Sequence, residues 1–237
     1  MKNINILCTI CARGGSKGLK KKALKKIYGK PLISYTVRQA LKSKVFKEVV
    51  VSTDSKKIQK VAKKYGAKSW FLRPKKFSND RSAKLLAIRH AFIESEKFFN
   101  NKFDICVDLD ITSPLRNVKD IKNSITKFIK NKKCNNLLSI CSAKKNPYYN
   151  MIEKNKNEYK MVRQKKNIFR RQDAPEVFEI NASIYIFRRN MLLKNYDLIN
   201  KKTITYLMPR NRSVDIDDIY DFNFVKFSIN KNEKLFK

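Results

Sequence analysis

Short apolar runs alternate with amphipathic segments from residue 4 to residue 131, and this alternation limits the chain to few folds. The apolar runs predict strands at 4–10, 47–53, 68–72 and 105–109, and the segments between and after them predict helices at 31–43, 55–65, 82–99 and 118–131. Strands that alternate with helices form a largely parallel sheet with helices on its faces. We therefore expect an α/β fold built on an open, mostly parallel central sheet.

The pattern changes after Leu137, where strand-like segments follow one another without helical periodicity between them. These segments are LLSICSA, YNMIEK, EYKMVR and FEINASIYIF, the last at 178–187. A polar stretch at 154–175 interrupts them and is predicted to leave the main sheet as a small excursion. A chain of 237 residues accommodates one domain of this kind, spanning 1–237, and has little room for a second.

Glycine is concentrated directly after the first predicted strand. Gly14, Gly15 and Gly18, three of the five glycines, lie within ARGGSKG. Glycines allow backbone N–H groups to approach an anion closely. Further donors and positive charge come from Arg13, Ser16, Lys17, Lys20, Lys21 and Lys22. The loop is thus predicted to bind phosphate. It matches neither GxxxxGKS/T nor GxGxxG, and a tight structural turn is the alternative.

Acidic residues gather near the C-terminus of an otherwise basic chain. The segment SVDIDDIYDF contains Asp215, Asp217, Asp218 and Asp221. If 213–216 ends a strand, Asp215 and Asp217 point to the same side, where two carboxylates would suit Mg²⁺ held jointly with substrate phosphates. The alternative is that Asp217 and Asp218 cap the N-terminus of a helix and bind no metal.

A third polar cluster, DLDITSPLR at 108–116, follows the strand predicted at 105–109. Asp108 and Asp110 lie at the end of that strand, and a hydroxyl-rich turn leads to Arg116. Open α/β sheets bind their ligands at the carboxyl ends of the strands. The segment is therefore a candidate ligand-binding turn.

The excess of basic residues raises the question of a nucleic-acid partner. Lysine and arginine outnumber aspartate and glutamate by 55 to 20, which gives a formal net charge of +35. Such an excess is typical of proteins that bind nucleic acid. Here the lysines run from Lys2 to Lys237 without forming one stripe or tail, and no aromatic-basic RNA-binding motif is present. We expect the charge to be spread over the solvated surface, with no nucleic-acid partner.

The cysteines and the apolar segments indicate the compartment. Five cysteines at low density favour free thiols in a reducing environment over a disulfide framework. No apolar run approaches the roughly 20 residues that a membrane-spanning helix needs. The apolar run at 4–12 leads straight into the glycine loop, so we interpret it as a buried strand and not as a secretory signal. The sequence predicts a cytoplasmic protein that is not bound to a membrane.

The motifs, in their order along the chain, resemble those of the acylneuraminate cytidylyltransferases. They are ARGGSKG, GKPLI, STDS, FLRP, TSPLR, RRQDAPE, INASIYIF and SVDID, and they cover nearly the whole chain. ICARGGSKG, NDRSAKL, LDITSPLR and KKNPYYNMIE look most like the legionaminic acid cytidylyltransferases within that family. The resemblance implies a Rossmann-like nucleotide-diphospho-sugar transferase fold, CTP as donor, Mg²⁺ as cofactor, and a homodimer built by an excursion at about 145–185.

The resemblance also implies a role for individual residues. Arg13, Lys22 and Asp217 would carry catalysis, and Asp215 and Asp217 would hold the magnesium ion. Ser16 and Lys17 would belong to the triphosphate-binding loop, whereas Arg73 and the segment around Ser82 would lie at the cytidine. The residues that would face the sugar are Asp110, Arg170, Arg171, Gln172 and Asn181.

The implied reaction is attack by the anomeric 2-hydroxyl of a nine-carbon 2-keto sugar acid on the α-phosphorus of CTP, with release of pyrophosphate. Two departures from the family pattern concern the substrates. Ala23 follows the loop lysine where asparagine is usual, and Asp110 and Ile111 precede TSPLR where sialic acid enzymes have Gln-Pro. Legionaminic and N-acetylneuraminic acid are both candidate acceptors, and an eight-carbon sugar acid of lipopolysaccharide or a nucleic-acid-binding role are the alternatives. The only histidine, His90, lies within a predicted helix, so the deprotonating group is either a carboxylate or a metal-bound hydroxide.

Overall fold

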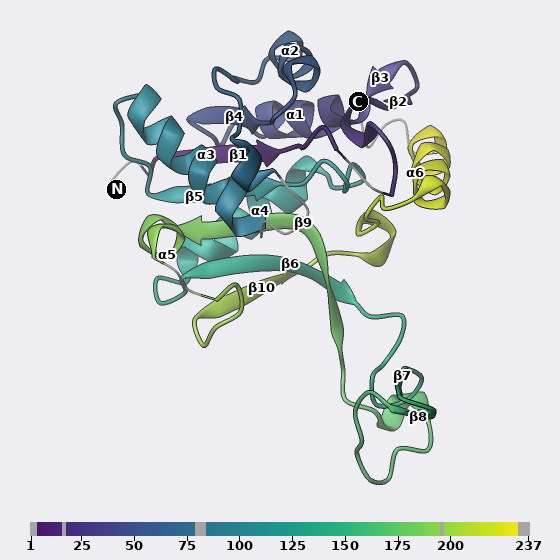
Figure 1. The fold of residues 1–237 in the computed structure, drawn as a ribbon. Coiled ribbons are helices and arrows are strands. Elements are labelled where there is room, and N and C mark those ends of the chain that lie inside the picture. Colours follow the sequence, from purple (N-terminus) through teal and green to yellow (C-terminus); the bar gives the residue numbers. More distant parts are fainter. Residues whose placement is uncertain (1–3, 16–17, 79–83, 195–196, 232–237) are drawn as a thin grey trace.

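The computed structural model describes residues 4–15, 18–78, 84–194 and 197–231, and it contains a six-stranded central sheet (Figure 1). The strands, in spatial order, are β10 (Thr203–Leu207), β6 (Asn136–Ser142), β9 (Phe178–Arg188), β5 (Ile105–Leu109), β1 (Ile6–Cys11) and β4 (Glu48–Ser52). β1 pairs in parallel with β4 and β5, and β6 pairs in parallel with β10. Only β9 runs antiparallel, between β5 and β6. The predicted α/β fold with a mostly parallel sheet is confirmed.

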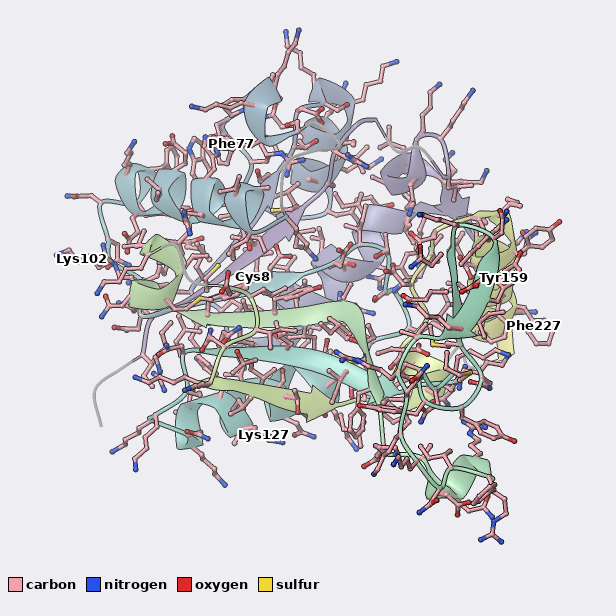
Figure 2. All side chains as sticks on the ribbon, turned by 60° about the horizontal axis from the view of Figure 1, so that its bottom comes forward. Cys8, Phe77, Lys102, Lys127, Tyr159 and Phe227 are labelled. Atoms are coloured by element: carbon pink, nitrogen blue, oxygen red, sulfur yellow. The ribbon has the colours of Figure 1, made fainter. Side chains whose placement is uncertain are left out.

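Helices cover both faces of this sheet. α1 (Leu32–Ser43), α2 (Lys56–Lys64) and α4 (Val118–Lys130) share one hydrophobic core with the sheet, and α3 (Lys84–Phe98) and α5 (Arg189–Leu193) share the other. Successive β1 residues serve the two cores in turn, since Leu7 joins one while Ile6 and Cys8 join the other. Figure 2 shows Cys8 on a strand inside the molecule, whereas Lys102 and Lys127 lie at its periphery. All five cysteines are free thiols.

The remaining elements are short or lie at the rim of the sheet. A small hairpin joins β2 (Lys26–Ile27) to β3 (Lys30–Pro31), and α6 (Ile219–Lys231) packs beside it over a third apolar cluster. Single 3₁₀ turns occur at Lys22–Leu24, Lys75–Phe77, Arg171–Asp173 and Arg210–Arg212. Within the described ranges, no helix has the length and apolar character required to cross a membrane.

The strand predicted at 68–72 is wrong. Lys68 forms one isolated bridge with Val50, and the chain then leaves the sheet. The reason is the aromatic packing that follows, because Trp70 stacks on Phe98 at the end of α3 with ring centroids 4.1 Å apart. β10, conversely, was not predicted, although its Ile204 and Tyr206 pack against the core.

The predicted excursion is present as an arm, residues 143–177, that projects from the carboxyl end of β6 (Figure 1). It carries its own antiparallel pair, β7 (Ile152–Asn155) and β8 (Glu158–Met161). The arm ends earlier than the predicted boundary at about 185, because β9 already belongs to the central sheet from Phe178 onward. The pairing of Ser142 with Phe178 returns both ends of the arm to the same point.

Candidate active site

The polar segments predicted from the sequence meet at one edge of the sheet. The parallel pairing of β1, β4 and β5 places the loops that follow them side by side. β9 runs the opposite way and enters the sheet at the same edge, so its first residues lie beside the turn after β5. This edge is where an open α/β sheet binds ligands.

The glycine loop is anchored to its neighbours by close backbone contacts. The N–H of Gly14 donates to Asp54 Oδ1 over 2.7 Å. At Gly18, a Cβ atom would lie 2.3 Å from the backbone oxygen of Asp217, so only glycine fits there. Arg13 is half-buried directly after β1. The predicted phosphate ligands Ser16 and Lys17 lie outside the described residues.

Lys22 links the glycine loop to the aspartate segment. Its side chain is largely buried, its ammonium donates to the backbone oxygen of Ile216, and it lies 3.5 Å from Asp217 Oδ1. These residues are separated by 195 positions in the sequence. The glycine loop and the aspartate segment, which were predicted to act together, are therefore in contact.

The segment 213–217 belongs to no strand, so the conditional prediction of a strand end at 213–216 is wrong. Its position is set by a hydrogen bond from the Ile216 N–H to the Thr112 oxygen, 2.9 Å long. Burial raises the pKa of Asp215, and the charges of Asp110 and Asp217 raise it further, whereas a hydrogen bond from Thr112 lowers it. The Asp217 side chain is 81% exposed.

The capping alternative accounts for Asp218 and not for the Asp217 side chain. Asp218 Oδ1 accepts from the N–H groups of Tyr220 and Asp221, over 2.8 and 3.0 Å, at the start of α6. Asp221 Oδ2 in turn accepts from the Asp217 N–H over 2.9 Å. The Asp217 carboxylate faces Lys22 instead. It is thus available for a ligand at the sheet edge.

Asp215 and Asp217 fit a hard cation. Asp215 Oδ1 is buried and has no hydrogen-bond partner among the described residues. An orphaned, buried carboxylate oxygen is costly unless a cation completes its coordination. In the described part of the chain, no group of three or more His, Cys, Asp or Glu side chains is arranged to hold a metal ion. A magnesium ion here would therefore depend on phosphate and water oxygens for its remaining ligands.

A second charged cluster, which the sequence analysis missed, lies at the end of β5. Lys84, at the start of α3, places its ammonium 2.6 Å from Asp110 Oδ2 and 3.3 Å from Asp108 Oδ2. It also lies over the Tyr185 ring, 4.3 Å from the centroid. Asp108 is fully buried, and Thr9 donates to its other oxygen over 2.9 Å. Lys84 thus neutralises two neighbouring carboxylates.

The partners of Asp110 keep it ionised. Burial by itself raises the pKa of Asp110, but Lys84 and two hydrogen bonds from Thr112, of 3.1 and 3.0 Å, bring that pKa below its ordinary value. For Asp108 the balance is the reverse, because burial outweighs Lys84 and raises the pKa. Asp110 is the carboxylate of this pair that is held as an anion at the sheet edge.

Arg116 supports the turn from behind. Its guanidinium is fully buried and donates to the backbone oxygen of Ser183 over 2.6 Å and to Gln39 Oε1 over 3.1 Å. It also donates to the backbone oxygen of Asp110. Burial lowers the pKa of Arg116 to about 10. Its position in the turn is structural, since it fixes β9 and α1 to the residues that carry the site.

Asn181 lies in a bulge of β9. Between the pairs Leu138–Tyr185 and Ile140–Ile180, β9 advances five residues while β6 advances two. The Asn181 amide oxygen accepts from Ser139 Oγ over 2.6 Å, and its nitrogen donates to Ser213 Oγ over 2.9 Å. Its side chain is therefore engaged within the protein, and its predicted contact with the sugar stays a prediction.

Arg73, predicted at the cytidine, lies where the chain leaves β4. Its N–H donates to the Thr53 oxygen over 2.7 Å, and its Nε donates to Ser78 Oγ over 3.0 Å. Thr53 follows β4, which is parallel to β1, so Arg73 lies at the same sheet edge as Lys84. Ser82 lies outside the described residues.

Three predicted sugar-binding residues are not brought to this edge within one chain. Arg170, Arg171 and Gln172 lie on the arm, which projects away from the sheet (Figure 1). Arg171 and Gln172 line a hollow there with Asn146 and Glu176. Arg170 pairs with Asp173 over 3.4 Å and remains largely exposed.

Comparison with known proteins identifies the family. A family profile described as Cytidylyltransferase matches residues 7–227. The chain belongs to the cytidylyltransferase family. This cytidylyltransferase is 45% identical over 225 residues to the CMP-N,N'-diacetyllegionaminic acid synthase of Campylobacter jejuni, with 94% of each chain covered. It is 42% identical over 225 residues to the post-translational flagellin modification protein B of Campylobacter coli, again with 94% of each chain covered.

More distant similarities agree with this assignment. The N-acylneuraminate cytidylyltransferase of Escherichia coli is 28% identical over 222 residues, which are 92% of this chain and 50% of that protein. Among solved structures, the CTP complex of CMP:2-keto-3-deoxy-manno-octonic acid synthetase superposes with a TM-score of 0.70, at 17% identity and with 96% and 99% of the two chains covered. The resemblance predicted from the motifs is confirmed, as is the fold. The cytidylyltransferase is accordingly a nucleotidyltransferase.

Proposed function

We propose that this cytidylyltransferase transfers CMP from CTP to the anomeric 2-hydroxyl of a nine-carbon 2-keto sugar acid and releases pyrophosphate. The observation that carries the proposal is the convergence on Asp217 of Gly18 and Lys22 from the glycine loop. A phosphate-binding loop that touches a carboxylate suited to Mg²⁺ is what transfer from a nucleoside triphosphate requires. The names of the relatives support a sugar acid as the acceptor.

The chain's own residues provide alignment and charge. Lys22 and Arg13 would stabilise the negative charge that develops on the departing pyrophosphate. Asp215 and Asp217 would hold magnesium, which supplies neutralisation of the triphosphate when bound. Asp110, held as an anion by Lys84, would accept a hydrogen bond from the sugar. Phosphoryl transfer of this kind depends on positioning more than on covalent catalysis.

Asp110 also bears on the identity of the acceptor. An ionised carboxylate only accepts hydrogen bonds, at about four lone-pair sites, and Lys84 and Thr112 use three of those of Asp110. One site remains for a donor on the substrate. Diacetyllegionaminic acid carries an acetamido N–H at C7 where neuraminic acid carries a hydroxyl. A hydroxyl also donates, so either group could fill this site. The 45% identity to the CMP-N,N'-diacetyllegionaminic acid synthase of Campylobacter jejuni leads us to favour diacetyllegionaminic acid as the acceptor.

Pyrophosphate release from CTP with a panel of sugar acids tests both parts of this proposal. We expect kcat/KM to favour diacetyllegionaminic acid over N-acetylneuraminic acid by at least about tenfold, and Asp110→Gln to narrow that difference. A preference for N-acetylneuraminic acid or for the eight-carbon acid would refute the acceptor. Absence of CTP-dependent pyrophosphate release with every acid would refute the reaction.

We further propose that the enzyme works as a homodimer in which the arm of one subunit reaches the site of the other. The arm exposes apolar side chains, among them Ile152, Tyr159 and Phe169. An isolated arm that exposes such groups and carries Arg171 away from the site of its own chain favours docking on a second copy.

Mixing two inactive variants tests this exchange. Arg171→Ala would damage the arm, and Asp217→Asn would damage the metal site. In a mixed dimer, one site would combine an intact arm with an intact metal site, so unfolding and refolding the two variants together should restore up to about a quarter of wild-type activity. No recovery in a mixture that contains mixed dimers would show that the arm does not act across the interface.

A further inference from the structure

A second concave site lies between α1 and the start of α4. The groove has a volume of about 570 Å³, and Tyr206 and Arg212 are among the residues that line it. Tyr35 from α1 and Asn123 from α4 form part of its walls. A concavity of this size accommodates a small molecule.

The groove is more basic than the chain as a whole. Its cationic residues are Lys30, Arg38, Lys42, Arg116, Lys119 and Arg212, and its only acidic residue is Asp120. Arg212 already neutralises Asp120 through contacts of 3.0 and 2.8 Å. Basic residues make up six of the 14 residues that line the groove, compared with 55 of 237 in the whole sequence.

Most of these cations have no counter-charge. Within the described residues, Lys30, Arg38, Lys42 and Lys119 form no salt bridge. Their positive charges lie along one concave surface, where field lines are focused and an anion is attracted more strongly than on a flat surface.

Arg116 adds a fixed, buried charge to the lining of the groove. It is fully buried, and its hydrogen-bond acceptors are neutral carbonyl, amide and hydroxyl oxygens. Its Nε has no partner among the described residues. Burial of this cation is unfavourable, and the nearby carboxylates of Asp110, Asp120 and Asp108 offset part of that cost. An anion in the groove would offset more of it.

We infer that this groove is an anion site for a small molecule carrying a phosphate group with at least two negative charges, separate from the candidate active site. The turn 110–116 connects the two, since Asp110 belongs to the candidate active site and Arg116 to the lining of the groove. Arg116 contacts the backbone of Asp110 on one side and Gln39, a wall of the groove, on the other. An enclosed groove favours a small molecule over nucleic acid, which would need an extended basic track.

Calorimetric titration of the full-length protein with pyrophosphate, without magnesium, tests the inference. The groove variant is Arg38→Gln with Lys42→Gln, and the matched control is Lys60→Gln with Lys64→Gln on α2, which removes the same charge from an exposed surface. We expect two binding events in the wild-type protein and the control. The groove variant should retain one of them and bind at the other at least about tenfold more weakly.

Parallel titrations with inorganic phosphate and with CMP distinguish the source of the phosphate group. If the groove variant loses more affinity for CMP than for pyrophosphate, each measured against the control, the groove is a nucleotide site. The reverse would identify an inorganic polyphosphate site. Identical isotherms for the groove variant and the control with all three probes would overturn the inference, whatever the outcome at the candidate active site.

Discussion

Replacing Lys84 with methionine should destabilise the protein by about 2–3 kcal/mol at pH 7. Lys84 lies 3.3 Å from Asp108, which is fully buried, and 2.6 Å from Asp110. Removing one partner of a buried ion pair costs about 3–5 kcal/mol because the remaining charge is uncompensated. The Lys84 side chain is 33% exposed, and solvent screening reduces the expected loss of stability to about 2–3 kcal/mol.

The loss of stability caused by Lys84→Met should increase as the pH rises. Burial already raises the pKa of Asp108, and removal of Lys84 raises it further above the value of about 3.9 in the unfolded chain. A carboxyl group with a raised folded-state pKa stabilises the fold below the unfolded pKa and loses that contribution as the pH rises. The difference in unfolding free energy between wild type and Lys84→Met should therefore be small near pH 4. It should grow by up to about 1.4 kcal/mol per pH unit toward pH 7.

Urea unfolding followed by circular dichroism at pH 5 and pH 7 measures this effect. Lys97→Met is the control, because Lys97 belongs to the same helix, is 70% exposed and pairs only with Glu94 among the described residues. It should cost less than about 0.5 kcal/mol at either pH. Adding Asp110→Asn to Lys84→Met should recover part of the loss. A deficit that is the same at both pH values, or equal to that of the control, would refute the proposed role of Lys84.

Four further substitutions separate contacts within the aspartate segment and the glycine loop. Gly18→Ala should lower kcat/KM for CTP by at least about tenfold, because the added Cβ would lie 2.3 Å from the Asp217 backbone oxygen. Gly15→Ala should have little effect in the same assay, because its added Cβ would have no neighbour within 4 Å. Asp217→Asn should abolish magnesium-dependent pyrophosphate release and leave the melting temperature nearly unchanged, because that side chain is 81% exposed. Asp218→Ala should show the opposite pattern, losing about 1 kcal/mol of stability through the cap of α6 while retaining activity.

The sequence predicted the parts of the site better than their arrangement. Each of Gly18, Lys22 and Asp217 belongs to a motif with a recognisable chemical role, and the parallel topology explains why the ends of β1 and β5 meet. The contact of Gly18 with the Asp217 backbone depends on how the segment 213–217 crosses the sheet edge. No periodicity encodes that path, because the segment is neither strand nor helix.

Lys84 and the strand errors have separate physical reasons. Lys84 is one of 55 basic residues in the sequence, and the residues next to it do not indicate that it contacts two buried carboxylates. The apolar run at 68–72 has the composition of a strand, but its Trp70 packs on a helix, and composition does not separate these two environments. The bulge at Asn181 could not be predicted from the sequence either, because strand register arises from pairing between distant segments.

Because β9 lies antiparallel between β5 and β6, the length and sequence of the arm can change in evolution more freely than those of the sheet strands. Since Ser142 pairs directly with Phe178, the whole arm is topologically the loop of one long hairpin. The entropy cost of closing a loop grows only slowly with its length. The arm can therefore lengthen, shorten or change its sequence without altering the register of the strands that carry Asp108 and Asp110. If the arm carries the proposed dimer contacts and sugar-facing residues, these can diverge while the proposed nucleotide-binding edge stays constant.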